Sequence, residues 1–206
     1  MSGRRNGLLA ALLFASAACV PQNIQLQDSL QDTRRLGGRG ANRSAALIGE
    51  CAVQLGSISD ARGDRSGLGD LGKVVEVQQP DFGKWVASGF ELLLAGSPGS
   101  AGAVPATASL PGAIRIDAEL LKTYVNLNGT SKAATVVVRT RFMDGSALLL
   151  EQVYRGNESF VNWSSSAEEM QSALDYCLRE ILTAARDDLG QLCAARAPAA
   201  RTAEAR

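Results

Sequence analysis

The first helical pattern of apolar residues along the chain predicts a helix over 82–95. Large apolar side chains recur there at spacings of three and four residues, which is typical of an amphipathic helix. Asp81 can cap the first turn, and Gly96 can end the helix. We expect the aromatic side chains of this stripe to lie in a core rather than in a ligand site: Phe82, Trp85 and Phe90.

A second and longer apolar stripe predicts a helix over 164–195. Its apolar positions form one continuous face from Met170 to Leu192. Two capping boxes can start it, Ser165 with Glu168 or Ser166 with Glu169. A face of this length needs a sheet to cover it.

Strand signals lie before the first of these helices and between the two helices. Apolar and polar residues alternate with period two in 51–58, at the start of 113–126 and in 133–142. We also expect a strand over 147–155, which pairs back on 133–142, and a short strand over 73–77. Asn128-Gly129 and Asp144-Gly145 are turn dipeptides, so the last three long strands form two hairpins. Arg139 and Arg141 lie on one face of the third long strand, where we expect them to be solvated rather than to bind an anion.

The order of elements, strand-helix-strand-strand-strand-helix, predicts the topology. A crossover helix makes the first two strands parallel, and the hairpins then make the sheet mixed. We therefore expect an α/β fold, a two-layer sandwich with both helices on one face of a mixed β-sheet, in a single domain spanning 46–195.

This topology leads to a predicted disulfide. The last strand runs parallel to the first, so the final helix returns to the start of the first strand and brings Cys193 near Cys51. Cys177 cannot pair with Cys193 on a continuous helix, because sixteen residues span about 24 Å. We predict a Cys51–Cys193 disulfide with Cys177 as a buried thiol; three reduced cysteines are the alternative.

The segments before and after the domain do not show the apolar patterns of its helices and strands. Residues 1–18 have a basic start, an apolar run too short for a transmembrane helix, and small residues before Cys19, which is the layout of a signal peptide. We expect Cys19 to be lipidated, although Ser16 stands where the lipobox usually has Leu; an ordinary cleaved signal is the alternative. Residues 19–45 should form a flexible tether and 196–206 a disordered tail.

Composition narrows the functional classes. The 206 residues contain 21 basic and 21 acidic side chains and no histidine. The balanced charge gives no reason to expect nucleic acid as a partner, and the lack of histidine removes the commonest general base and metal ligand. We expect no catalytic residues, no metal and no cofactor.

The Gly-rich stretch after the first strand holds the main polar cluster. It contains Asp60, Arg62, Asp64 and Asp70, without the residue order of a phosphate-binding loop or a calcium-binding loop. We interpret Asp60 and Arg62 as a structural pair that pins the loop to the strand end. Contact with a small ligand or a partner is the alternative, and catalysis is the least favoured.

Two groups of short motifs have little weight. Arg62-Gly63-Asp64 is the adhesion tripeptide, which a Gly-rich loop contains by chance. Four N-glycosylation sequons would carry glycans in a eukaryotic secreted protein and would mean nothing in a bacterial lipoprotein: Asn42, Asn128, Asn157 and Asn162.

The chain resembles YajG-like bacterial lipoproteins and, more loosely, the auxiliary lipoproteins of ABC-type transporters. The resemblance rests on Cys19, on VQLGSISDAR at 53–62, on the Gly-rich loop, on the helix around 85–94 and on the closing helix. It implies an envelope protein attached to the outer membrane and facing the periplasm; Val20 after the cysteine, rather than Asp, agrees with that sorting.

These observations favour a non-catalytic, lipid-anchored envelope protein that works through protein partners, as an accessory of a transport or envelope-assembly complex. The alternative is a periplasmic binding module for a small apolar or lipid ligand held between sheet and helices. The two hypotheses predict different cores, because a ligand carrier needs an unfilled apolar cavity and a partner-binding domain can have a filled core.

Overall fold

The computed structural model describes residues 25–30, 48, 51–63, 65, 68, 81–95, 112–128, 130–161 and 166–203. The signal segment 1–18, Cys19 and the expected strand 73–77 lie outside these residues, as do Asp64 and Asp70.

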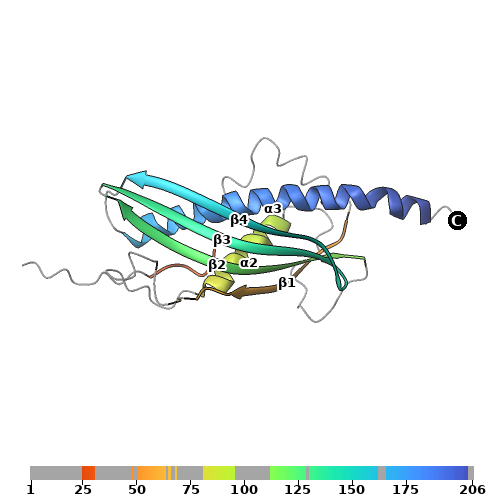
Figure 1. The fold of residues 1–206 in the computed structure, drawn as a ribbon, viewed down its shortest axis with the longest axis horizontal. Helices are drawn as coiled ribbons and strands as arrows, with labels where there is room; N and C mark the ends of the chain where they lie inside the picture. Colours follow the sequence, from red (N-terminus) through yellow and green to blue (C-terminus); the bar gives the residue numbers. More distant parts are fainter. Residues whose placement is uncertain are drawn as a thin grey trace, which may run out of the picture.

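One four-stranded sheet and two helices form the domain (Figure 1). The elements are β1 (Val53–Asp60), α2 (Phe82–Ala95), β2 (Ile114–Asn128), β3 (Ser131–Asp144), β4 (Ala147–Val161) and α3 (Ala167–Ala203). The sheet order is β1-β2-β3-β4, with β1 parallel to β2 and the other pairs antiparallel. Both helices lie behind the sheet in Figure 1, so the predicted two-layer α/β sandwich with a mixed sheet is confirmed.

Helix α2 has the predicted bounds and the predicted cap. The Lys84 N–H donates to Asp81 Oδ1 at 3.0 Å, which satisfies one of the free amides of the first turn. The aromatic side chains of its apolar stripe, Phe82, Trp85 and Phe90, are buried. They belong to the core between the helices and the sheet, as the spacing predicted.

The strands are longer than the alternation alone indicated. β4 continues to Val161 rather than 155, and β3 starts at Ser131 rather than 133. The Asp144-Gly145 hairpin is present, and Gly145 adopts the positive φ of 56° that this tight turn requires. The extra length arises where neighbouring strands pair, and that pairing is a tertiary effect that a single strand's pattern does not contain.

Helix α3 begins at Ala167, three residues after the predicted start, and ends later than predicted. The Glu169 N–H donates to Ser166 Oγ at 3.2 Å, so the second of the two candidate capping serines starts the helix. The helix then continues to Ala203, where a disordered tail from 196 was expected. Six of the eight residues in 196–203 are alanine or arginine, which have high helix propensity; Pro198 in the same stretch does not.

The expected tether 19–45 is interrupted by an ordered segment. Residues 25–30, called the strap below, lie against the two helices, with Leu26 and Leu30 buried in the core. The Gln27 N–H donates to Gln171 Oε1 at 3.0 Å, and the Leu30 N–H donates to Ser88 Oγ at 2.9 Å. Two leucines spaced four apart in a polar stretch are too weak a signal to reveal this contact from the sequence.

No helix in the described part of the chain combines the length and apolar character needed to cross a membrane.

The closest approach between the two layers gives a stability prediction. A Cβ on Gly156 of β4 would overlap the backbone carbonyl of Cys177 in α3. Gly156→Ala should therefore push helix from sheet and lower the free energy of unfolding by about 1–3 kcal/mol. Urea denaturation measures this change. Gly63→Ala is the matched control, since nothing lies within 4 Å of a Cβ at that glycine; equal stability of both variants would contradict the close approach.

Candidate functional site

The start of β1 and the far part of α3 are joined by a covalent bond. Cys51 and Cys193 form a disulfide with their Cα atoms 5.6 Å apart. This is the pairing that the topology predicts, and 142 residues separate the two cysteines in sequence. A bond closing so long a loop constrains the unfolded chain strongly, and disulfides persist in oxidising compartments such as the periplasm.

Cys177 is the free cysteine among the described residues, and it is inaccessible. Its thiol lies in the core between α3 and the sheet, 3.6 Å from the Ala134 carbonyl oxygen that accepts its hydrogen bond. Burial, with the charges of Glu180 and Glu158, raises the pKa of the Cys177 thiol to about 12. A thiol in this state is a structural side chain and a poor nucleophile.

Asp60 and Arg62 form a pair at the end of β1. The Arg62 guanidinium donates from Nε to Asp60 Oδ1 at 2.9 Å and from Nη2 to Oδ2 at 2.7 Å. The same guanidinium lies over the Phe82 ring, 4.3 Å from its centroid. Arg62 is 6% exposed, so the pair joins the strand end to the first residue of α2. This geometry favours the structural interpretation of the pair.

The electrostatics of Asp60 agree with that interpretation. Burial opposes ionisation of the carboxyl group, but hydrogen bonds and charge from Arg62 outweigh it, so the pKa of Asp60 is lowered. An acid or base of catalysis near neutral pH needs the opposite shift for a carboxyl group. Asp60 is therefore an anion at neutral pH and holds Arg62.

A buried polar chain, which the sequence reasoning missed, connects the strap to both helices. The Trp85 indole donates to Asp175 Oδ1 at 2.8 Å, and the Gln171 amide nitrogen donates to the same oxygen at 2.7 Å. Gln171 then accepts from the Gln27 backbone. Trp85 and Asp175 each lie within an apolar helix stripe, and buried polar groups need hydrogen-bond partners. This placement was the sequence signal that could have indicated their hydrogen bond.

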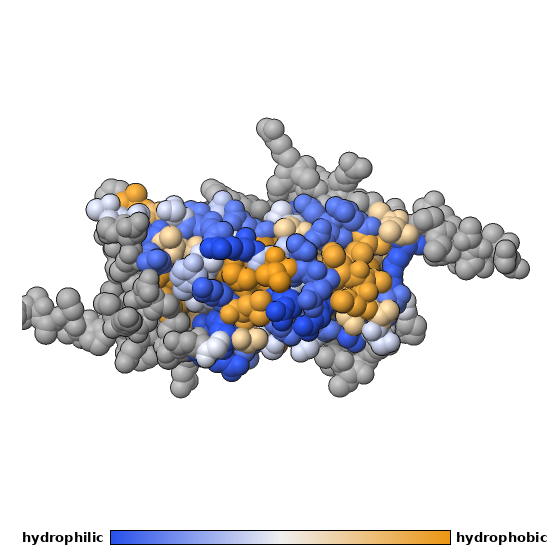
Figure 2. All heavy atoms as spheres, viewed as in Figure 1, coloured by the Kyte–Doolittle hydropathy of each residue, from blue (hydrophilic) through white to orange (hydrophobic). Residues whose placement is uncertain are grey.

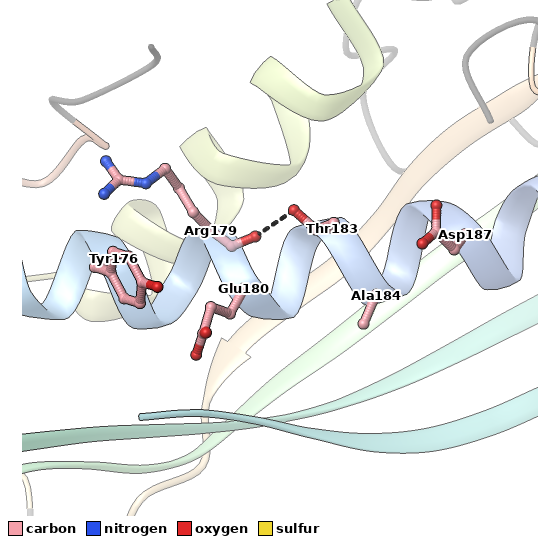
Figure 3. A pocket seen from close by; sticks show the side chains of 6 residues that line it. All are labelled: Tyr176, Arg179, Glu180, Thr183, Ala184 and Asp187. Carbon is pink, nitrogen blue, oxygen red and sulfur yellow. Dashed lines mark hydrogen bonds between the residues drawn. The ribbon is translucent and has the colours of Figure 1, made fainter. Parts of the chain in front are cut away.

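A groove of about 450 Å³ runs along α3 (Figure 3). Among its described lining residues, Arg179 and Glu180 point to different sides of the helix in Figure 3. Glu180 accepts from the Asn157 N–H at 3.2 Å, and the Arg179 carbonyl accepts from the Thr183 hydroxyl at 2.8 Å. These groups are engaged with the protein itself and do not converge on a common point, so the groove lacks the arrangement of an acid–base site.

The outer face of the sheet carries a ladder of ion pairs. Arg139 and Arg141 each pair with Glu119 at 3.0 Å, and Arg141 also pairs with Glu151 at 2.6 Å. The hydrogen bond from Arg141 lowers the pKa of Glu151. Both arginines are thus neutralised by neighbouring strands, which agrees with a solvated face and not with an anion site.

Apolar side chains interrupt this charged face. Figure 2 views the sheet side, where hydrophobic areas lie between hydrophilic ones. Among the described residues, the large apolar side chains that remain exposed belong to β4: Leu148, Val153 and Val161. A mixed apolar and charged surface on a sheet is suited to contact with another protein.

The part of the chain that the structure describes holds no cluster of metal ligands. No group of three or more His, Cys, Asp or Glu side chains that could hold an ion occurs there.

Comparisons with known proteins identify the fold. No family model matches the chain, and no curated protein matches its sequence. A DUF330 protein from Xanthomonas campestris has a similar structure, with a TM-score of 0.51, 10% identity, and coverage of 83% of this chain and 97% of that one. A candidate lipoprotein from Caulobacter crescentus gives a TM-score of 0.43 at 11% identity, covering 75% of this chain and 97% of its own. This chain therefore has a fold similar to that of the DUF330 protein.

The Asp60–Arg62 pair predicts a pH-dependent loss of stability. Asp60→Ala should lower the free energy of unfolding by about 2–3 kcal/mol, because it leaves a buried guanidinium without its counter-ion. Since the folded pKa of Asp60 is lowered, its contribution is present above the ordinary Asp value and is lost as pH falls through the folded pKa. Denaturation of both proteins at neutral and acidic pH should show the difference narrowing in acid. Lys84→Ala, which breaks an exposed pair with Asp81, is the control and should change stability by less than about 0.5 kcal/mol.

The state of the cysteines predicts a labelling pattern. Iodoacetamide should modify none of residues 51, 177 and 193 in the native protein. After denaturation without reductant it should modify Cys177 alone, because Cys51 and Cys193 are bonded to each other. Peptide mass spectrometry reads the three positions separately. Three modified cysteines in the unreduced, denatured protein would rule out the disulfide.

Proposed function

We propose that this chain is a non-catalytic, lipid-anchored envelope protein that acts through protein partners. The observation that carries the proposal is the Cys51–Cys193 disulfide in a chain whose first 19 residues have the layout of a lipoprotein signal. The bond belongs to an oxidising compartment, and the signal leads to such a compartment. The fold similarity to the DUF330 protein is compatible with this role.

The location and assembly form the finer part of the proposal. Cys19 would carry the lipid, with Val20 after it directing the protein to the outer membrane, where the domain faces the periplasm. The resemblance to YajG-like and ABC-transport auxiliary lipoproteins supports an accessory role in a transport or envelope-assembly complex. The contact surface would be the outer sheet face, where β4 exposes Leu148 and Val153 beside the ion-pair ladder.

The core favours this role over carriage of an apolar ligand. A carrier would keep a cavity between sheet and helices. The described residues there include large side chains that are entirely enclosed, Trp85, Phe90 and Phe142 among them. The described residues that line the groove all belong to α3, and among them are the charged Arg179, Glu180 and Asp187 beside Ala184. A partner-binding role therefore has the better structural support.

Lipid labelling tests the anchor. Cells grown with an alkyne palmitate analogue should incorporate the label into the wild-type protein and not into Cys19→Ala, which should leave the membrane fraction. Equal labelling of both proteins, or a soluble unlabelled wild type, would contradict the anchor.

Photo-crosslinking tests the partner. A benzoylphenylalanine at Val153 or Leu148 should give a discrete crosslink to another envelope protein in the native cells. The same amino acid at Ala194, which is exposed on α3, is the matched control and should give none. An anchored protein without a crosslink specific to β4 would leave the anchor standing and refute this surface.

A further inference from the structure

The strap is held by polar contacts that fix its position on the helices. Gln171 presents its oxygen to the Gln27 N–H because its amide nitrogen is held by Asp175, which the Trp85 indole also contacts. On α2, Ser88 accepts from the Leu30 N–H. With Leu26 and Leu30 buried, the strap has both apolar and directional contacts.

These contacts lie at one end of an elongated domain. Gln171 is in the first turns of α3, and nearby the buried Lys132 at the start of β3 pairs with Glu169 at 3.0 Å. At the other end, Asp144 in the β3–β4 turn pairs with Arg196. Along α3, the 27 residues from 169 to 196 span about 40 Å. The strap end and the β3–β4 turn are therefore about 40 Å apart.

The strap also shortens the chain that leads to Cys19. A flexible chain from Cys19 to residue 45 would allow the domain to change its distance from the membrane and its orientation relative to it. With the strap bound, six residue steps separate Cys19 from Gln25, and a fully extended chain covers about 20 Å in that number. This limit is about half the separation between the two ends of the domain.

We propose that the strap turns the end of the domain bearing the first turns of α3 toward a phospholipid bilayer. The proposal rests on the lipidation of Cys19 proposed above. The membrane-facing surface comprises the first turn of α3 and the end of β4, where Val161 is 51% exposed. The β3–β4 turn then points away from the bilayer, and Leu148 beside it is presented to a protein partner at a distance from the lipid headgroups.

Energy transfer to the membrane tests this orientation. The full lipidated chain is reconstituted in phosphatidylethanolamine–phosphatidylglycerol vesicles with a rhodamine headgroup lipid as acceptor. A donor dye is attached to Glu168→Cys or to Ser146→Cys, both exposed positions at opposite ends. The buried Cys177 and the disulfide leave the new thiol as the labelling site among the described cysteines. Transfer should be greater from position 168 than from position 146.

Release of the strap should abolish this difference. Leu26→Asp with Leu30→Asp removes its apolar contacts, and Gln171→Leu removes the acceptor of the Gln27 N–H while leaving α3 intact. Either change should bring transfer from the two positions together, provided that circular dichroism shows a folded domain. Gln191→Leu, an exposed substitution of the same kind on α3, is the control and should keep the difference.

The outcomes separate the orientation from the anchor. Mass spectrometry of the same samples reports the lipid on Cys19. A wild type that carries the lipid, binds the vesicles and shows equal transfer from both positions overturns the orientation and leaves the anchor intact. Absence of the lipid overturns both proposals. Unequal transfer that persists after release of the strap assigns the orientation to another contact and also overturns this inference.

Discussion

The apolar stripe of α3 is the constraint on which the rest of the fold depends. A helix of 37 residues is about 55 Å long, and it must bury one side along most of that length. Strands of 14 or 15 residues, at about 3.3 Å per residue, reach nearly as far. The long hairpins β2–β3 and β3–β4 therefore provide the surface that the helix requires. Gly156 permits the close contact at which the two layers meet.

The chain ends are secured to this framework by different means. The disulfide ties the start of β1, the edge strand of the described sheet, to Cys193, ten residues before the end of α3. The strap ties the N-terminal segment to the opposite end of the same helix through Gln171. One tie is covalent and depends on the compartment. The other consists of two leucines and a few hydrogen bonds, which a competing contact could replace.

Charge is used differently inside and outside the domain. Asp60 and Arg62 are largely removed from solvent, so loss of either partner leaves a buried ion and should be costly. The ladder around Glu119 is half exposed, and pairs of this kind contribute little to stability. The ladder keeps the outer sheet face charged and solvated around the exposed apolar residues of β4.

The sequence by itself determined the order of elements, the bounds of α2 and both hairpins, and it favoured the Cys51–Cys193 pairing, with three reduced cysteines as the alternative. Each follows from local periodicity, turn dipeptides or the handedness of a crossover, which are encoded over short stretches. Tertiary structure decided the rest. Leu26 and Leu30 are buried because they pack against the surface formed by α2 and α3. The surrounding residues show no apolar periodicity that would predict this burial. Asp175 receives the Trp85 indole only when α2 packs beside α3, and Arg139 meets Glu119 only when β3 pairs with β2, so these contacts required the tertiary structure.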